Sequence, residues 1–229
     1  MAERILVTGG AGFIGSNLVE ALVAEGHDVV VLDDLSTGQE SNLAAAASRV
    51  TLLRGSVGDE AACREAVAGC SVVFHEAAVA SVPRSVAEPV ATHHINATST
   101  LVLLEACRAA GVRRLVFAAS SAAYGDDPTP VKHEGLAPRP LSPYAAQKVA
   151  GEHYLSIYHR LHGLETVALR YFNVFGRRQD PKSEYAAVIP KFIARMTAGQ
   201  RPIIFGDGLQ SRDFVHVDDV VSANLAAMV

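Results

Sequence analysis

Tyr144 and Lys148 stand four residues apart in the stretch "SPYAAQK" at 142–148. On a helix, that spacing places both side chains on one face, one turn apart. A free tyrosine, with a pKa of about 10, is a poor base at neutral pH, but a nearby ammonium stabilises its phenolate and lowers that pKa. The pair could therefore take the proton of a hydroxyl group that is being oxidised. Roughly one chain in ten would contain such a pair by chance. The pair therefore indicates catalysis only if the surrounding residues support that role.

Two serines supply that context. The run "RRLVFAAS" at 113–120 is typical of a strand, and it ends in Ser120, with Ser121 next. In open α/β sheets, ligands lie beyond the carboxyl ends of the strands. A proline-rich loop then leads into the helix that begins near Tyr144, so this helix can return to the same edge. We therefore expect Ser120, Ser121, Tyr144 and Lys148 to be catalytic, with a serine hydroxyl sharing the hydrogen bonds at the reacting oxygen.

Short β-branched runs alternate with longer helical segments along most of the chain. The expected strands are 4–9, 28–33, 50–55, 71–77, 113–120 and 166–173, and the expected helices are 13–25, 59–68, 92–110 and 143–162. Nearly continuous apolar strands suit a parallel sheet that is covered on both faces. The pattern predicts an α/β protein with a Rossmann-type doubly wound parallel sheet.

The composition changes near residue 174, where proline and glycine become frequent. We therefore divide the chain into a cofactor-binding domain at 1–173 and a smaller, incomplete substrate-binding region at 174–229. The final stretch, "DDVVSANLAAMV", is typical of a helix that is cut short.

The first expected strand leads into the motif Gly9-x-x-Gly12-x-x-Gly15. Glycines allow a tight turn and a close approach of the backbone to a pyrophosphate, and the start of the following helix offers free N–H groups. Asp33 ends the next strand, where an acidic residue binds ribose hydroxyls. No arginine follows until Arg49, so nothing obvious would hold a 2′-phosphate. The motif predicts NAD rather than NADP.

Composition and charge exclude several other classes. With a net charge of −4 and no basic run, the chain is not expected to bind nucleic acid. Its three cysteines match no metal or redox spacing, and His93 and His94 have no suitably spaced ligand partner, so we expect no metal. There is no signal-like start and no apolar run of about 18 residues, so we expect a cytoplasmic protein that does not enter membranes.

Eight stretches carry a resemblance to a known family. They are "VTGGAGFIGSNL", "LDDLSTG", "VFHEAAVASVPRS", "ASSAAYGD", "RPLSPYAAQK", "LRYFNVFGRRQDP", "AAVIPKFI" and "FGDGLQSRDFVHVDDV". In this order they resemble the extended short-chain dehydrogenase/reductase family of NAD-dependent epimerases and dehydratases, and within it the nucleotide-sugar 4-epimerases. The resemblance covers nearly the whole chain.

The resemblance also implies contact residues. Cofactor contacts fall on Gly9, Gly12, Phe13, Ile14, Gly15, Asp33, Asp34, Ser36, Thr37, Gly38, Ser56, Val57, Ala77, Ala78 and Asn96, together with Tyr144 and Lys148. Ser56 stands where many members have an aspartate near the adenine. Nucleotide-sugar contacts fall on Ser81, Arg84, Ser120, Tyr144, Asn173, Ala187, Val188, Phe205 and Arg212, of which Arg212 is our best candidate for the diphosphate.

The reaction implied by the resemblance is 4-epimerisation of a UDP-sugar through a transient 4-keto intermediate, on UDP-glucose and UDP-galactose or also on their N-acetylated forms. The alternatives are a UDP-glucuronate 4-epimerase or decarboxylase, a dTDP-glucose 4,6-dehydratase, and a non-catalytic protein that binds NAD or a nucleotide sugar. Relatives that dehydrate or decarboxylate usually carry an acid within two positions of the catalytic Ser or Thr. Ser121 and Ala122 occupy those positions here, which argues against both reactions.

Two further expectations rest on the family. A homodimer is expected to form through the helices at 92–110 and 143–162. Epimerases of this type usually exceed 300 residues, so at 229 residues the sequence is expected to lack part of the sugar pocket.

Overall fold

The computed structural model describes residues 2–180 and 188–229. A six-stranded parallel sheet lies at its centre, with strand order β3-β2-β1-β4-β5-β6. Its strands are β1 (Arg4–Thr8), β2 (Asp28–Asp33), β3 (Val50–Arg54), β4 (Val72–His75), β5 (Arg114–Ser120) and β6 (Glu165–Tyr171). The predicted Rossmann-type sheet is confirmed.

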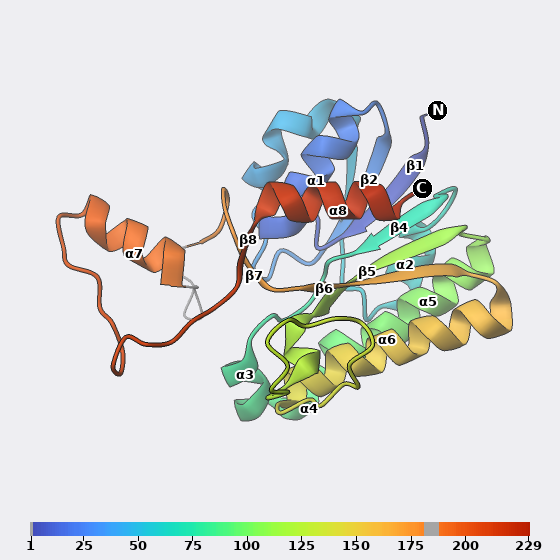
Figure 1. Ribbon diagram of the computed structural model, residues 1–229. Helices are drawn as coiled ribbons and strands as arrows, with labels where there is room; N and C mark the ends of the chain where they lie inside the picture. Colours follow the sequence, from blue (N-terminus) through green and yellow to red (C-terminus); the bar gives the residue numbers. More distant parts are fainter. Residues whose placement is uncertain (1, 181–187) are drawn as a thin grey trace.

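Helices cover both faces of this sheet (Figure 1). The helical elements are α1 (Phe13–Ala24), η1 (Glu40–Arg49), α2 (Glu60–Ala66), α3 (Val82–Ala87), α4 (Pro89–His93), η2 (His94–Thr98), α5 (Ser99–Ala110), η3 (Ser121–Tyr124), α6 (Pro143–His162), α7 (Val188–Thr197) and α8 (Val217–Ala227). Apolar residues of α1, η1 and α8 form one core against the sheet, and those of α2, α5 and α6 form the other. Because both faces are buried, the strands are apolar almost throughout.

Two predicted boundaries were wrong. The helix expected at 92–110 begins earlier, at Pro89, and passes through a π-helical turn at His94–Thr98. Such turns insert one extra residue, and here Asn96 lies buried within the turn. The strand expected at 166–173 ends at Tyr171, and β7 (Asn173–Phe175) pairs instead with β8 (Phe214–His216) in a second small sheet.

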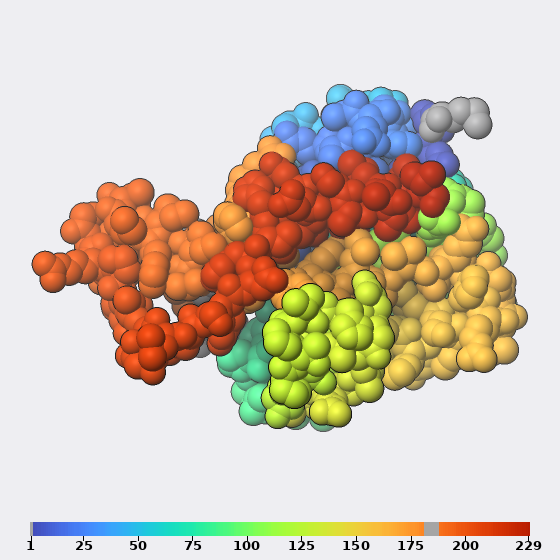
Figure 2. All heavy atoms as spheres, viewed as in Figure 1, coloured from blue at the N-terminus to red at the C-terminus, as the bar shows by residue number. Residues whose placement is uncertain are grey.

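The C-terminal part both leaves the sheet and returns to it. Figure 1 shows α7 standing away from the sheet on an extended arm. By contrast, α8 contacts α1 and β6, and Figure 2 shows it lying along the surface over the sheet. The division of the chain into two domains at residue 173 stays a prediction. Helix α8 belongs to the predicted second domain but packs against the first.

Helix α6 packs unusually closely on β5. Its start is fixed by Pro143 and by Ser142, whose Oγ accepts from the Ala145 N–H, and its end is fixed by Gly163 at φ 72°. Midway along it, a Cβ built on Gly151 would lie 2.7 Å from Cζ of the Phe117 ring. Phe117 is fully buried, so the glycine allows the helix to reach the strand.

We expect Gly151→Ala to lower the free energy of unfolding by up to about 2 kcal/mol. Alanine favours a helix over glycine by about 1 kcal/mol. Overpacking costs about 1–3 kcal/mol, and we expect it to dominate because the Phe117 ring is fully buried. Urea denaturation measures the change, with Ser156→Ala on the exposed side of the same helix as the control. A more stable Gly151→Ala variant would contradict this packing account.

Candidate active site

The glycine motif forms a tight turn between β1 and α1. Gly9 has φ +66°, and a Cβ there would lie 2.7 Å from the Ala77 backbone nitrogen. A Cβ on Gly15 would lie only 2.3 Å from the Gly9 carbonyl oxygen. Gly12 caps α1 in an extended conformation, and Phe13 and Ile14 begin the helix, partly exposed. Side chains are thus excluded from a turn that faces a helix N-terminus, which suits a pyrophosphate.

Asp33 stabilises this turn directly. The carboxylate is buried at the end of β2, where Oδ2 accepts from the Ala11 N–H at 2.9 Å and Oδ1 accepts from the Leu35 N–H at 2.8 Å. Each carboxylate oxygen can accept a second hydrogen bond, so contacts with ribose hydroxyls remain available. A Cβ on Gly38 would lie 3.0 Å from Ala11, so the loop carrying Asp34, Ser36 and Thr37 lies against the same turn.

The other predicted cofactor residues follow the neighbouring strands. Ser56 and Val57 come after β3, and Ala77 and Ala78 come after β4. Asn96 is buried, and its side-chain amide makes hydrogen bonds within the chain. Its Oδ1 accepts from the Val79 N–H at 2.8 Å, and its Nδ2 donates to Val79 O and to Gln147 Oε1. In this structure Asn96 holds the segment after β4, and its direct contact with a cofactor stays a prediction.

Ser120 and Tyr144 meet at the carboxyl end of β5. The Oγ of Ser120 accepts from the Ala122 N–H at 3.2 Å, and the Ser120 side chain lies close enough to that of Tyr144 to lower its pKa. The Tyr144 backbone N–H donates to Ser85 Oγ at 3.0 Å, which fixes the start of α6 against α3. Ser121 is the neighbouring residue, in η3. The structure therefore brings the predicted serine and tyrosine together.

Lys148 lies buried one turn further along α6. Its Nζ donates to the Ala118 carbonyl at 2.7 Å and lies 4.8 Å from the centre of the Phe117 ring. Burial lowers the pKa of Lys148 to about 8, while the charge of Glu76 raises it. An ammonium has three donors, so it can also bind a ribose hydroxyl.

The expected lowering of the Tyr144 pKa does not occur in this structure. Burial raises the pKa of Tyr144, and only the hydrogen bond with Ser120 acts in the other direction. Desolvation disfavours the phenolate, and the Lys148 ammonium makes its hydrogen bond with a backbone carbonyl instead. Tyr144 therefore keeps its proton in the chain alone.

Glu76 was not among the predicted site residues. It follows β4 directly, and the Tyr171 hydroxyl donates to its Oε1 at 2.9 Å. Burial raises the pKa of Glu76 to about 7, although the Tyr171 hydrogen bond and Lys148 both lower it. The sequence signal was a single acidic residue at the end of an apolar strand.

The predicted substrate residues lie on several separate elements. Ser81 caps α3 and accepts from the Arg84 N–H, while Arg84 pairs with Glu88. Asn173 begins β7 and donates to Asp213 O. Val188, Phe205 and Arg212 lie on the arm that carries α7, and both Phe205 and Arg212 are exposed. Ala187 lies outside the described residues. All of these substrate contacts stay predictions.

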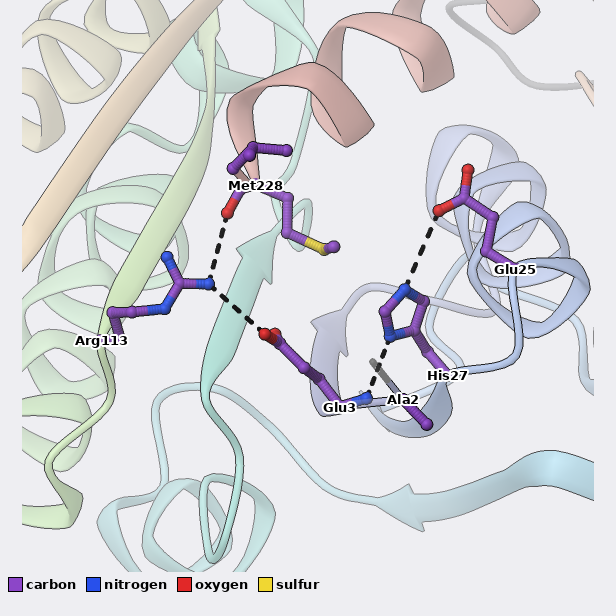
Figure 3. A pocket seen from close by; sticks show the side chains of 7 residues that line it. Ala2, Glu3, Glu25, His27, Arg113 and Met228 are labelled. Carbon is purple, nitrogen blue, oxygen red and sulfur yellow. Dashed lines mark hydrogen bonds and ion pairs between the residues drawn. The ribbon is translucent and has the colours of Figure 1, made fainter.

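A separate cavity of about 460 Å³ lies at the opposite edge of the sheet, near the amino ends of β1, β2 and β5 (Figure 3). His27 and Arg113 line it, with Glu3 between them: its N–H donates to His27 Nδ1 at 3.2 Å, and its carboxylate lies 3.7 Å from Arg113. Ligands of such sheets bind at the carboxyl ends, so this cavity is not the candidate site.

Residues 2–180 and 188–229 contain no cluster of histidine, cysteine and acidic side chains that could hold a metal ion. In the same ranges, no helix is long and apolar enough to cross a membrane.

The fold and the site together define an enzyme of the dinucleotide-dependent short-chain type, with a serine, a tyrosine and a lysine beside a glycine turn. A family model described as "NAD dependent epimerase/dehydratase family" matches residues 5–229. The chain belongs to this family, and NAD is its cofactor. The glycine turn, which an added Cβ would fill, and the buried Asp33 fit that cofactor.

The chain is similar to several named proteins. A UDP-glucose 4-epimerase of Mycolicibacterium smegmatis is 44% identical over 228 residues, covering 98% of this chain and 72% of that protein. The solved UDP-N-acetylglucosamine 4-epimerase of Methanobrevibacter ruminantium, in complex with UDP-N-acetylmuramic acid, has a TM-score of 0.95 at 44% identity, covering 99% of this chain and 73% of that one. The UDP-glucose 4-epimerase of Thermus thermophilus, in complex with NAD, has a TM-score of 0.90 at 44% identity, covering 98% of this chain and 74% of that one.

Relatives with other reactions are also present. A UDP-N-acetyl-alpha-D-glucosaminuronate decarboxylase of Bacillus cytotoxicus is 34% identical, covering 100% of this chain and 72% of that protein. A dTDP-glucose 4,6-dehydratase of Streptomyces niveus is 36% identical, covering 94% of this chain and 66% of that protein. Family membership alone therefore leaves the reaction open.

We expect Gly15→Ala to weaken NAD binding at least about tenfold, or 1.4 kcal/mol. The added Cβ meets a backbone oxygen, so the turn itself must shift away from the pyrophosphate position. Isothermal titration calorimetry measures the affinity. Gly111→Ala is the control, because it strains a residue at φ +71° in open space, away from the turn. Unchanged NAD affinity in Gly15→Ala would contradict the assignment of this turn.

Proposed function

We propose that the chain is a nucleotide-sugar 4-epimerase that interconverts UDP-glucose and UDP-galactose, with the N-acetylated pair as further substrates. The observation that carries the proposal is the meeting of the Ser120 and Tyr144 side chains, with Lys148 one turn away, at the sheet edge that also carries the glycine turn. The similarity to UDP-glucose and UDP-N-acetylglucosamine 4-epimerases supports the same reaction.

The residues of this chain divide the acid–base work. When bound, NAD supplies the acceptor for hydride from sugar C4 and returns hydride to the opposite face. Tyr144 takes the proton of the 4-hydroxyl group and later gives it back to the 4-keto oxygen. The Ser120 hydroxyl forms a hydrogen bond with the same oxygen and orients it toward Tyr144. Lys148 supplies the positive charge that favours the phenolate during this transfer.

The residues after Ser120 support epimerisation over dehydration. Loss of water needs an acid and a base for the C5 proton and the C6 oxygen. Ser121 and Ala122, in η3, provide neither carboxyl group.

We expect Tyr144→Phe to reduce epimerisation about 100-fold or more while NAD binding persists. The change removes the group that exchanges the proton but leaves the cofactor turn intact. Proton NMR of UDP-galactose and of UDP-N-acetylgalactosamine, each incubated with the protein and NAD, follows formation of the 4-epimer.

The matched control for this experiment is Tyr154→Phe, on the same helix and partly buried. Near-normal turnover by Tyr144→Phe would show that Tyr144 does not exchange the proton of the 4-hydroxyl group. If the unmodified chain converts neither sugar, UDP-glucuronate and dTDP-glucose test the alternative reactions.

The homodimer through α5 and α6 is likewise a proposal. Ile157 and Leu161 form an apolar stripe, four residues apart on the outer face of α6, and they are 45% and 71% exposed. Two copies of this stripe could cover one another if the helices of both subunits packed together.

We expect Leu161→Asp to convert a dimer into a monomer, because a buried charge opposes the apolar contact. Size-exclusion chromatography with light scattering measures the mass. Val131→Asp, in the loop before α6 and also exposed, is the control. A dimer that survives Leu161→Asp would place the interface elsewhere.

A further inference from the structure

His75 ends β4 as a buried histidine, and no step of the proposed reaction uses it. Its ring lies between two hydroxyl groups: Thr8 Oγ1 is 2.8 Å from Nδ1, and Thr100 Oγ1 is 3.0 Å from Nε2. Thr8 ends β1, directly before Gly9 of the glycine turn, and its Oγ1 also accepts from the Ala77 N–H at 3.3 Å. Thr100 lies in α5. The ring therefore connects the strand that leads into the glycine turn with a helix that covers the sheet.

The directions of these hydrogen bonds determine the tautomer of His75. Thr100 Oγ1 lies 2.8 Å from the Asn96 carbonyl oxygen, which can only accept, so the single hydroxyl proton of Thr100 is used there. Thr100 must then accept from His75, which puts the ring proton on Nε2. Burial and the charge of Lys148 lower the pKa of His75 to about 3, so the ring is neutral. Its Nδ1 therefore accepts from the Thr8 hydroxyl.

The same chain of hydrogen bonds continues into α6, the helix of the catalytic tyrosine and lysine. Asn96, whose carbonyl accepts from Thr100, donates through Nδ2 to Gln147 Oε1 at 2.8 Å. Gln147 Nε2 donates in turn to Thr92 Oγ1 at 3.0 Å, so both ends of this side-chain amide are bonded. Gln147 directly precedes Lys148. The amide therefore ties α6 to the π-helical turn.

These side chains form one continuous chain of hydrogen bonds, which we call the polar network. Its members are each at most 3% exposed, and they are Thr8, His75, Thr100, Asn96 and Gln147. Water cannot easily replace a partner that is lost from such a buried network, so each hydrogen bond constrains its neighbours. The polar network thus begins one residue before the glycine turn and ends one residue before Lys148.

We propose that the polar network positions α6 relative to the glycine turn, and that His75 is its central positioning residue. The inference rests on the proposed function, because Tyr144 and Lys148 act in that site. The glycine turn suits the pyrophosphate of NAD, and the Lys148 ammonium has donors for a ribose hydroxyl. Binding of NAD therefore depends on the distance between the two elements that the polar network joins.

The tautomer of His75 gives a spectroscopic test. The chain has nine histidines, so protein labelled with ¹⁵N at histidine gives few ring signals, and His75→Leu identifies those of His75. We expect an unprotonated Nδ1 and a protonated Nε2 from about pH 5 to 8. Thr100→Val removes the acceptor of the Nε2 proton, so we expect the proton to move to Nδ1, where Thr8 Oγ1 can accept it. In Thr8→Val we expect the proton to stay on Nε2. A protonated Nδ1 in the unmodified chain, or one tautomer in both variants, overturns the proposal.

Affinity for NAD tests the positioning role without any reaction of a sugar. We expect His75→Leu and Gln147→Met, which remove polar atoms at similar size, each to weaken NAD binding about threefold or more in calorimetry. The double variant is expected to bind NAD about as weakly as either single variant, because both changes break the same network. The matched control is Tyr158→Phe. It removes a hydrogen bond to Glu105 that also joins α6 to α5 but lies outside the polar network, and we expect unchanged NAD affinity.

Circular dichroism checks that each variant folds. If His75→Leu does not fold, Gln147→Met and Thr100→Val carry the affinity test. Unchanged NAD affinity in the folded variants overturns the proposal. An equal loss of affinity in Tyr158→Phe also overturns it, because any contact between the two helices would then have the same effect.

Epimerisation of UDP-galactose gives the last readout. In His75→Leu with saturating NAD we expect kcat to fall about tenfold or more, because a small misplacement of the reacting groups is costly. We expect the KM for the sugar to stay within about twofold, because most predicted sugar contacts lie outside the polar network. An unchanged kcat overturns the positioning role. The expected tautomers and NAD affinities without any epimerisation leave that role standing and remove the proposed function. Epimerisation with unchanged NAD affinity in the variants does the reverse.

Discussion

The close approach of α6 to β5 fixes the position of the active-site side chains. At Gly151 the helix reaches the fully buried Phe117 ring, and one turn earlier Lys148 lies over the same ring with its Nζ on Ala118 O. Tyr144, a further turn back, then meets Ser120 at the end of the strand. Because one helix–strand contact carries both side chains, a small error in it would misplace the base and the cation together, and such misplacements are costly in catalysis.

Burial is the main electrostatic influence at this edge of the sheet. It raises the pKa of Tyr144, lowers that of Lys148 to about 8 and raises that of Glu76 to about 7. Each shift favours the neutral form, as desolvation requires. The site therefore depends on charges that compensate one another, and hydrogen bonds from Ser120 and Tyr171 offset part of the cost. Burial of this kind strengthens the effect of any charge placed beside these groups.

Sequence periodicity and turn chemistry were sufficient to predict a parallel sheet and the serine and tyrosine that meet at its carboxyl edge. Gly9, Gly15, Ser120, Tyr144 and Lys148 lie in segments with a strong local signal. The rest depends on tertiary contacts that no local pattern encodes. The π-helical turn that buries Asn96 and the end of β6 at Tyr171 follow from partners far along the chain. Glu76 was unpredicted for the same reason, since its partners come from β6 and α8.

The C-terminal segment illustrates how distant sequence influences the site. Helix α8 follows an arm that leaves the sheet, yet it packs beside α1 and sends Asn224 to the Tyr171 hydroxyl. That hydroxyl donates to Glu76 Oε1, directly after β4. The packing of α8 is therefore joined to the residue after β4 through two hydrogen bonds. A shift of α8 along the sheet would move Asn224 away from the Tyr171 hydroxyl and so disturb the donor to Glu76.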